Sequence, residues 1–104
     1  MHRGEVWWAF LPPPIGRRPV LLLSREAVYQ VRTFVTVGVV TRTVRGIPTE
    51  VSLGPEDGMP ARCVANLDNI LTIPKDQLVE QITTLSTEKM SAVAEAIAFA
   101  LDLG

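Results

Sequence analysis

The sequence predicts a mainly β protein with α content (class α+β), in which short strands form a small antiparallel barrel or coiled sheet closed by one helix. Six or seven short segments rich in β-branched and apolar residues follow one another, separated by turns that contain Pro or Gly. Near the C-terminus the pattern changes, and apolar residues recur at helical spacing. The chain of 104 residues contains no repeat and no linker, so we expect a single domain over residues 1–104.

The first three strands are expected at Glu5–Leu11, Val20–Ser24 and Phe34–Val44. Pro12-Pro13-Pro14 ends the first strand, because proline offers no amide donor to a sheet. The apolar run of the second strand is typical of a strand buried on both faces. The polar residues Arg25–Arg32 predict a loop with room for one helical turn.

The second half of the chain predicts shorter strands and then the helix. The strands are expected at Thr49–Leu53, Arg62–Asn66, Ile70–Ile73 and Leu78–Leu85, with a break at Asp68-Asn69. Ser86 is the expected N-cap of the helix, and Glu88 follows in the first turn, where the helix dipole favours an acid. The apolar face of this helix is expected to comprise Met90, Val93, Ala94, Ile97 and Leu101.

Composition excludes several classes of protein. Hydrophobic residues make up 47% of the chain and charged residues 20%, which is typical of a compact globular protein. The single cysteine, Cys63, allows no internal disulfide, and no apolar run could span a bilayer, so we expect a cytoplasmic protein without membrane contact. One histidine and one cysteine cannot build a zinc site, and no dinucleotide or Walker glycine pattern is present. We therefore expect no metal and no cofactor.

The net charge of −1 hides an asymmetry along the chain. Residues 1–48 hold seven arginines and two acids, whereas residues 49–104 hold three basic residues and nine acids. Arginine is the residue type preferred for phosphate contacts, so the first half favours a nucleic-acid partner. The alternative is that a basic face and an acidic face pair within or between subunits.

Arg18 is the leading candidate for a functional side chain. It lies at the entrance of the apolar second strand, directly before Pro19, and a following proline biases a residue toward extended geometry. A guanidinium held in this way is well suited to bind a phosphate, because its planar fork carries five donors and stays charged. The alternative is a surface arginine that caps a strand.

A second segment, Ile47-Pro48-Thr49-Glu50-Val51, stands out beside the Arg18 segment. With these residues the chain resembles the MazF/PemK family of toxin endoribonucleases. The resemblance covers nearly the whole chain in the same order. The matching segments are Arg3–Trp8, Arg18–Ser24, Pro48–Val51, Asn66–Lys75 and Ile82–Ser86.

The resemblance implies an SH3-like β-barrel with a C-terminal helix, of the PemK/CcdB toxin type, and a homodimer. It implies sequence-specific, metal-independent cleavage of single-stranded RNA (mRNA, or rRNA or tRNA), which leaves a 2′,3′-cyclic phosphate and a 5′-hydroxyl. It also implies a cognate antitoxin that neutralises the toxin. Arg18 then stabilises the charge that develops on the phosphate, and Thr49 is the second catalytic residue, a hydroxyl donor.

The sequence departs from the family pattern at two places. The loop Pro12–Arg17 is shorter than in many relatives and contains no acid, and Glu50 stands where relatives often have histidine. Glu5 and Glu50 remain as candidates for the general base. Arg18 itself stays protonated, so it is expected to stabilise charge rather than to accept a proton.

Several further residues are candidates for binding the substrate. Trp7 is expected to stack on a base, whereas Trp8 shares a strand face with Val6 and Phe10 and is expected in the core. The set also comprises Gly16, Arg17, Ser24, Glu50, Asn66 and Asn69. A solvated loop is the alternative for Arg17, and turn hydrogen bonds are the alternative for the two asparagines.

A second hypothesis remains open at this point. A non-enzymatic toxin or binding module of the same barrel class, for example a poison of DNA gyrase, would share the fold without the reaction. In either case we expect the antitoxin to carry a flexible acidic tail that crosses the arginine-bearing face.

Overall fold

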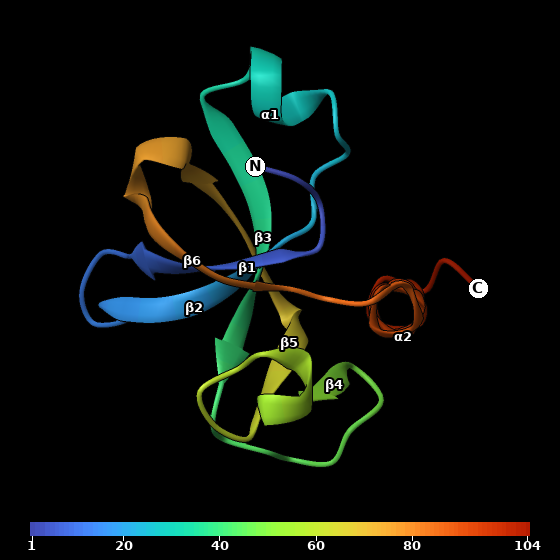
Figure 1. Ribbon diagram of the computed structural model, residues 1–104. Coiled ribbons are helices and arrows are strands. Elements are labelled where there is room, and N and C mark those ends of the chain that lie inside the picture. Colours follow the sequence, from blue (N-terminus) through green and yellow to red (C-terminus); the bar gives the residue numbers. More distant parts are fainter.

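The computed structural model describes all residues 1–104, and its centre is one six-stranded antiparallel sheet with the strand order β4-β5-β3-β2-β1-β6. The sheet is strongly coiled: β1 and β2 cross β3, and helix α2 lies at one side (Figure 1). This architecture confirms the predicted α+β class, the antiparallel coiled sheet and the C-terminal helix. The elements are β1 (Glu5–Phe10), β2 (Arg17–Leu22), α1 (Val28–Val31), β3 (Phe34–Thr41), β4 (Glu50–Leu53), the 3-10 turn η1 (Pro55–Asp57), β5 (Cys63–Pro74), η2 (Lys75–Gln77), β6 (Leu78–Thr84) and α2 (Thr87–Ala100).

Two hydrophobic clusters form the core, one on each face of β2. Leu21 belongs to the cluster that includes Leu53, Leu67 and Val93, which joins β2, β4, β5 and α2. Its neighbours in β2, Val20 and Leu22, belong to the second cluster. Successive side chains of a strand point to opposite faces, which explains why the β2 segment is apolar without interruption.

The bounds of β2 and β3 differ from the prediction at the end that carries Arg18. Strand β2 begins at Arg17 rather than Val20, and Arg18 pairs with Ala9 of β1. Strand β3 pairs only with Val20–Leu22, so Pro19 lies beyond that pairing and its missing amide costs no bond to β3. Strand β3 ends at Thr41 rather than Val44, which leaves residues 42–44 exposed in the loop to β4.

Strand β5 is one continuous strand, although a break was predicted at Asp68-Asn69. The break is instead a bulge: Gly38 of β3 pairs with Ile70, and the next residue, Val39, pairs with Asn66. The side chain of Leu67 turns into the core, and its amide donates to the carbonyl oxygen of Thr49 at 2.9 Å. The bulge therefore replaces the predicted turn.

The C-terminal helix begins as predicted, and most of its predicted apolar face packs on the core. The Ser86 hydroxyl accepts a hydrogen bond from the Lys89 amide at 3.1 Å, which confirms the N-cap. Val93 and Ala96 are the buried residues of α2. The prediction was wrong for Ala94, which is exposed, and for Leu101, which lies past the end of the helix and is also exposed. Met90 and Ile97 pack against the first cluster, which confirms their place on the apolar face. Ala92 and Ala96 complete this face in place of Ala94 and Leu101.

Two further points complete the fold. The loop between β2 and β3 contains the predicted helical turn as α1. None of the helices combines the length and the apolar character needed to cross a membrane.

Candidate active site

Arg18 lines a small cavity that three neighbouring strands build together. The cavity has a volume of about 230 Å³, and its walls come from β2, β3, the β3–β4 loop and the bulge of β5. We call it the polar cavity. Its lining comprises two guanidinium groups, two threonines and two asparagines beside one valine, and no carboxylate: Arg18, Arg45, Thr41, Thr43, Asn66, Asn69 and Val39. A site with this lining suits an anion.

The same arginine also lines a larger cavity with different walls. This second cavity, which we call the Trp8 cavity, has a volume of about 450 Å³ and shares Arg18, Thr41 and Thr43 with the polar cavity. Its remaining lining is mostly apolar: Trp8, Pro19, Val40, Met59, Pro60, Ala61 and Cys63, with Arg42. Arg18 therefore stands where the two cavities meet. None of the four ion pairs in the structure involves it.

Thr49 does not share either cavity with Arg18. It is only 5% exposed, and its hydroxyl donates a hydrogen bond of 2.7 Å to Oδ2 of Asp68 in the β5 bulge. The Asp68 amide in turn donates to Oδ1 of Asn66 at 3.0 Å, and Asn66 lines the polar cavity. Thr49 is thus linked to the site through the bulge, and its proton is directed at a carboxylate.

The two candidates for the general base lie elsewhere. The Glu50 carboxylate accepts hydrogen bonds from the backbone amides of Arg45 at 3.0 Å and Gly46 at 2.9 Å, and it lines a separate cavity between β4 and α2. Glu5 is buried, and its Oε1 accepts from the indole N–H of Trp7 at 2.9 Å. Neither carboxylate lines a cavity that contains Arg18.

The surroundings of the two tryptophans are the reverse of those predicted. Trp7 packs against the second hydrophobic cluster, whereas Trp8, which was expected in the core, lines the Trp8 cavity. Phe10 was expected on the same buried face, and it is 56% exposed. Alternation along β1 is as predicted, because Val6 packs in the first cluster and Ala9 in the second. Trp8 and Phe10 instead pair with the end of β2 that lies outside the first cluster.

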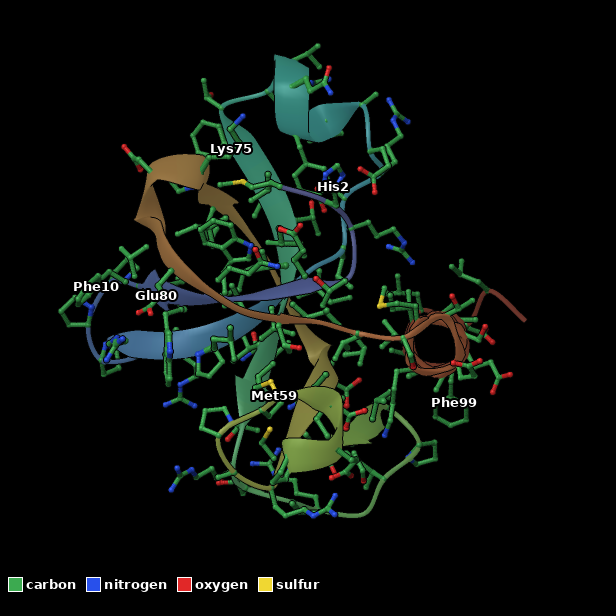
Figure 2. The ribbon with its side chains drawn as sticks, viewed as in Figure 1. His2, Phe10, Met59, Lys75, Glu80 and Phe99 are labelled. Atoms are coloured by element: carbon green, nitrogen blue, oxygen red, sulfur yellow. The ribbon has the colours of Figure 1, made fainter.

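Arg17 lies against the exposed side of this region. Its guanidinium carbon is 4.4 Å from the centroid of a Trp8 ring, a cation–π distance, and its Nη2 is 4.0 Å from Oε1 of Glu80. Figure 2 shows Glu80 on β6, beside the β1–β2 hairpin. Arg17 therefore belongs to β2 rather than to the preceding loop, and its guanidinium contacts Trp8.

Gly16 and Ser24 both accept hydrogen bonds from backbone amides. Gly16 has a positive φ of 68°, and its carbonyl accepts from the Leu11 amide at 3.0 Å, which closes the β1–β2 turn. The Ser24 hydroxyl accepts from the Thr36 amide at 2.8 Å and lies beyond the other end of β2. The structure does not bring either residue into the two cavities of Arg18.

Several lining residues were missed by sequence reasoning. Thr41, Arg42 and Thr43 were expected only as part of the strand Phe34–Val44, and Arg45 was not assigned, yet all four line the cavities. The available signal was the concentration of arginine in the first half of the chain. Trp8 and Met59 gave no such signal, because their apolar side chains fit a core position equally well.

Cys63 is the one titratable thiol at the site. Burial raises the pKa of the Cys63 thiol, and the positive charge of Arg42 acts in the opposite direction. The reactive thiolate is therefore scarce at neutral pH. No group of three or more His, Cys, Asp or Glu side chains is arranged to hold a metal ion.

Comparison with known proteins gives a consistent result. Residues 2–101 match the family model described as "PemK-like, MazF-like toxin of type II toxin-antitoxin system". The chain is 39% identical over 101 residues to the probable endoribonuclease MazF5 of Mycobacterium tuberculosis, which covers 96% of this chain and 92% of that protein. The solved structure of the Mycobacterium tuberculosis toxin MazF-mt6 superposes with a TM-score of 0.88 at 41% identity, over 96% of this chain and 98% of the other. An endoribonuclease in complex with its cognate antitoxin, from mycobacterial species, superposes with a TM-score of 0.89 at 33% identity, over 100% and 97%.

Proposed function

Since the chain belongs to the PemK-like and MazF-like toxins of type II toxin–antitoxin systems, we propose that it cleaves single-stranded RNA, at particular sequences, beside Arg18. The protein is an endoribonuclease toxin, and an antitoxin is its partner. One observation carries the choice of site. Arg18 joins two cavities whose charged side chains are all arginines, in a protein with a net charge of −1.

The proposed reaction builds up negative charge on the phosphate, which Arg18 can stabilise. The ribose 2′-hydroxyl loses its proton to water and attacks the adjacent phosphorus, and the bond to the 5′-oxygen breaks. The 5′-oxygen takes a proton from water, so the products are a 2′,3′-cyclic phosphate and a 5′-hydroxyl. Negative charge gathers on the non-bridging oxygens in the transition state. Arg18 would donate to these oxygens from a strand that is paired on both sides of its apolar segment, so little reorganisation is needed.

Thr49 is the second residue that we propose for catalysis. Its hydroxyl donates to Asp68 in the structure, so it can donate to a phosphate oxygen only after that hydrogen bond is exchanged. Asn66 and Asn69, which line the polar cavity, are proposed to bind the RNA next to the scissile phosphate.

The remaining features of the proposal concern assembly and location. We propose that residues 1–104 act as one toxin domain in the cytoplasm, where the free Cys63 stays reduced. We further propose a homodimer. Phe99, Leu101 and Leu103 are 63%, 56% and 69% exposed at the C-terminal end of α2, where Figure 2 shows Phe99 projecting outward. The mass of the protein in solution, measured by light scattering, tests the dimer.

The central test is cleavage by the purified protein in EDTA. We expect RNA to be cut with 2′,3′-cyclic phosphate ends, and Arg18→Ala to lower kcat by about 10²–10³-fold, the usual cost of removing one transition-state donor. Arg25→Ala is the matched control, because Arg25 is exposed and lines neither cavity. Full activity of Arg18→Ala, or loss of activity in EDTA, would contradict the proposal. Growth arrest with intact transcripts would favour a gyrase-type poison instead.

A further inference from the structure

The Trp8 cavity differs from the polar cavity in the chemistry of its walls. Met59, Cys63 and Val40 are buried and form an apolar floor, and Trp8 and Pro19 add flat apolar surface. Figure 2 shows Met59 on the segment that follows η1, below the sheet. The charged groups of the lining are Arg18 and Arg42, and both are cations. These walls fit a flat, uncharged ring that is attached to an anion.

Trp8 is prepared for stacking in a way that Trp7 is not. The indole N–H of Trp7 donates to Glu5, and its ring packs against the second hydrophobic cluster. Trp8 is half-buried and makes no hydrogen bond within the chain, so its N–H is free to meet an acceptor. Arg17 lies over the Trp8 ring without lining the cavity, so it holds the indole from outside.

The position of Arg18 connects this cavity to the substrate. The side chain lines both cavities, so a phosphate bound to Arg18 lies at their junction. A nucleotide on one side of that phosphate is then within reach of Trp8 and Met59. Methionine adapts to flat ring systems, and tryptophan stacks on any base.

We propose that the Trp8 cavity binds one unpaired nucleobase of the RNA, the base next to the phosphate that Arg18 holds. This inference rests on the proposed function, because it takes single-stranded RNA as the substrate. The polar cavity then receives phosphate and polar base edges, and the Trp8 cavity receives the ring.

The first test combines Trp8→Leu with an RNA that lacks one base next to the scissile bond. In the parent protein, removal of that base should lower kcat/KM about tenfold or more, as loss of one stacked base does. Trp8→Leu should lower kcat/KM for the complete RNA by a similar factor. In this variant, removal of the base should then lower kcat/KM hardly any further. Trp8→Phe should retain most of the activity. The inference is wrong if, at every position, removal of a base lowers kcat/KM as much in Trp8→Leu as in the parent protein.

Matched variants keep this test informative. Phe34→Leu changes an exposed aromatic residue at the far end of β3, and it should leave the base dependence unchanged. Ala61→Leu fills the cavity while Trp8 stays in place, and it should reproduce the loss even if Trp8→Leu folds poorly.

A binding measurement separates this inference from the proposed function. The chain has two tryptophans, so Trp7→Phe leaves Trp8 as the only one. We expect 2′-O-methyl RNA homopolymers, which cannot be cleaved by this reaction, to quench the fluorescence of Trp8 for at least one of the four bases. Quenching without any cleavage of ordinary RNA would overturn the proposed reaction and support the base site. Cleavage with no quenching by any homopolymer would overturn the base site alone.

Discussion

Arg18 and Thr49, the two residues proposed for catalysis, have opposite surroundings. Arg18 lines two open cavities, whereas Thr49 is buried and hydrogen-bonded to Asp68. A threonine in this position can either supply a donor to the phosphate or simply hold the β5 bulge. The two roles predict different losses on substitution.

Thr49→Ser should retain most of the cleavage activity, because the hydroxyl is kept. Thr49→Val should lower kcat by about 10²-fold if the hydroxyl donates to the transition state. It should also lower the melting temperature, because Asp68 loses its partner. Steady-state kinetics with melting curves for both variants check this. A Thr49→Val variant that cleaves at the parental rate would leave Thr49 with a structural role only.

Tyr29 lowers the stability of the folded protein through its buried hydroxyl. Its buried hydroxyl has no hydrogen-bond partner, and burial raises the pKa of Tyr29 from its ordinary value of 10.0 to about 12. An unfolded chain therefore ionises this tyrosine at lower pH than the folded chain does. The contribution to stability is fully present below pH 10 and is lost as the pH rises toward 12.

Tyr29→Phe should remove the loss of stability at alkaline pH. At neutral pH it should leave the free energy of unfolding unchanged or raise it by about 1 kcal/mol. Urea unfolding of both proteins between pH 9 and roughly 12 measures the difference. Because Tyr29 is the only tyrosine, its absorbance also reports ionisation directly. A titration midpoint near 10 in the folded protein would contradict the burial effect.

At the scale of elements, Glu50 holds the loop between β3 and β4. Its carboxylate accepts from the amides of Arg45 and Gly46, and the loop contributes Arg42, Thr43 and Arg45 to the two cavities. Glu50 therefore acts on the site through the backbone of this loop. A role as general base would require its carboxylate to face the scissile phosphate instead.

Glu50→Gln should keep at least one of these hydrogen bonds and most of the cleavage activity. Glu50→Ala should release the loop, raise KM for RNA several-fold and lower the free energy of unfolding by about 1–3 kcal/mol. Kinetics and urea unfolding of the pair of variants measure both effects. Loss of kcat in Glu50→Gln without a change in stability would indicate a general base after all.

At the scale of the whole molecule, the fold places many basic and many acidic side chains on different parts of the surface. Four of the seven arginines of the first half gather at or beside the two cavities, namely Arg17, Arg18, Arg42 and Arg45. The acids Glu50, Asp57, Glu88 and Glu95 line the separate cavity between β4 and α2. One ion pair, Arg17 with Glu80, joins an arginine of the first half to an acid of the second. Pairing within the chain thus leaves most of the basic surface free for an anionic partner.

The antitoxin should use this basic surface. We expect an acidic antitoxin segment to compete with uncleavable RNA, and its affinity to fall about tenfold or more as salt is raised from roughly 50 to 500 mM. Arg45→Gln should weaken both ligands, whereas Arg32→Gln, at the α1 end of the molecule, should affect neither. Competition titrations at several salt concentrations measure this. Salt-insensitive binding of the segment would contradict the electrostatic account.

Much of the fold depends on local signals, although the break that they predicted within β5 is a bulge in one continuous strand. Prolines, glycines and the change of hydrophobic period located the strands and the capped helix, because these features act within a few residues of the chain. The site was predicted only in part. Arg18 was recognised from its place before Pro19, but its neighbours from the β3–β4 loop were not.

The sequence by itself therefore determined the class of fold, the capped C-terminal helix and the arginine at the edge of a buried strand. Only the tertiary structure decided that Trp8 rather than Trp7 lies beside Arg18, that residues 67–69 bulge, and that Ser24 binds the backbone amide of Thr36. These outcomes depend on strand register and on hydrogen-bond partners far apart in the chain. A single shift of register moves a side chain to the other face, and no local pattern reports that shift.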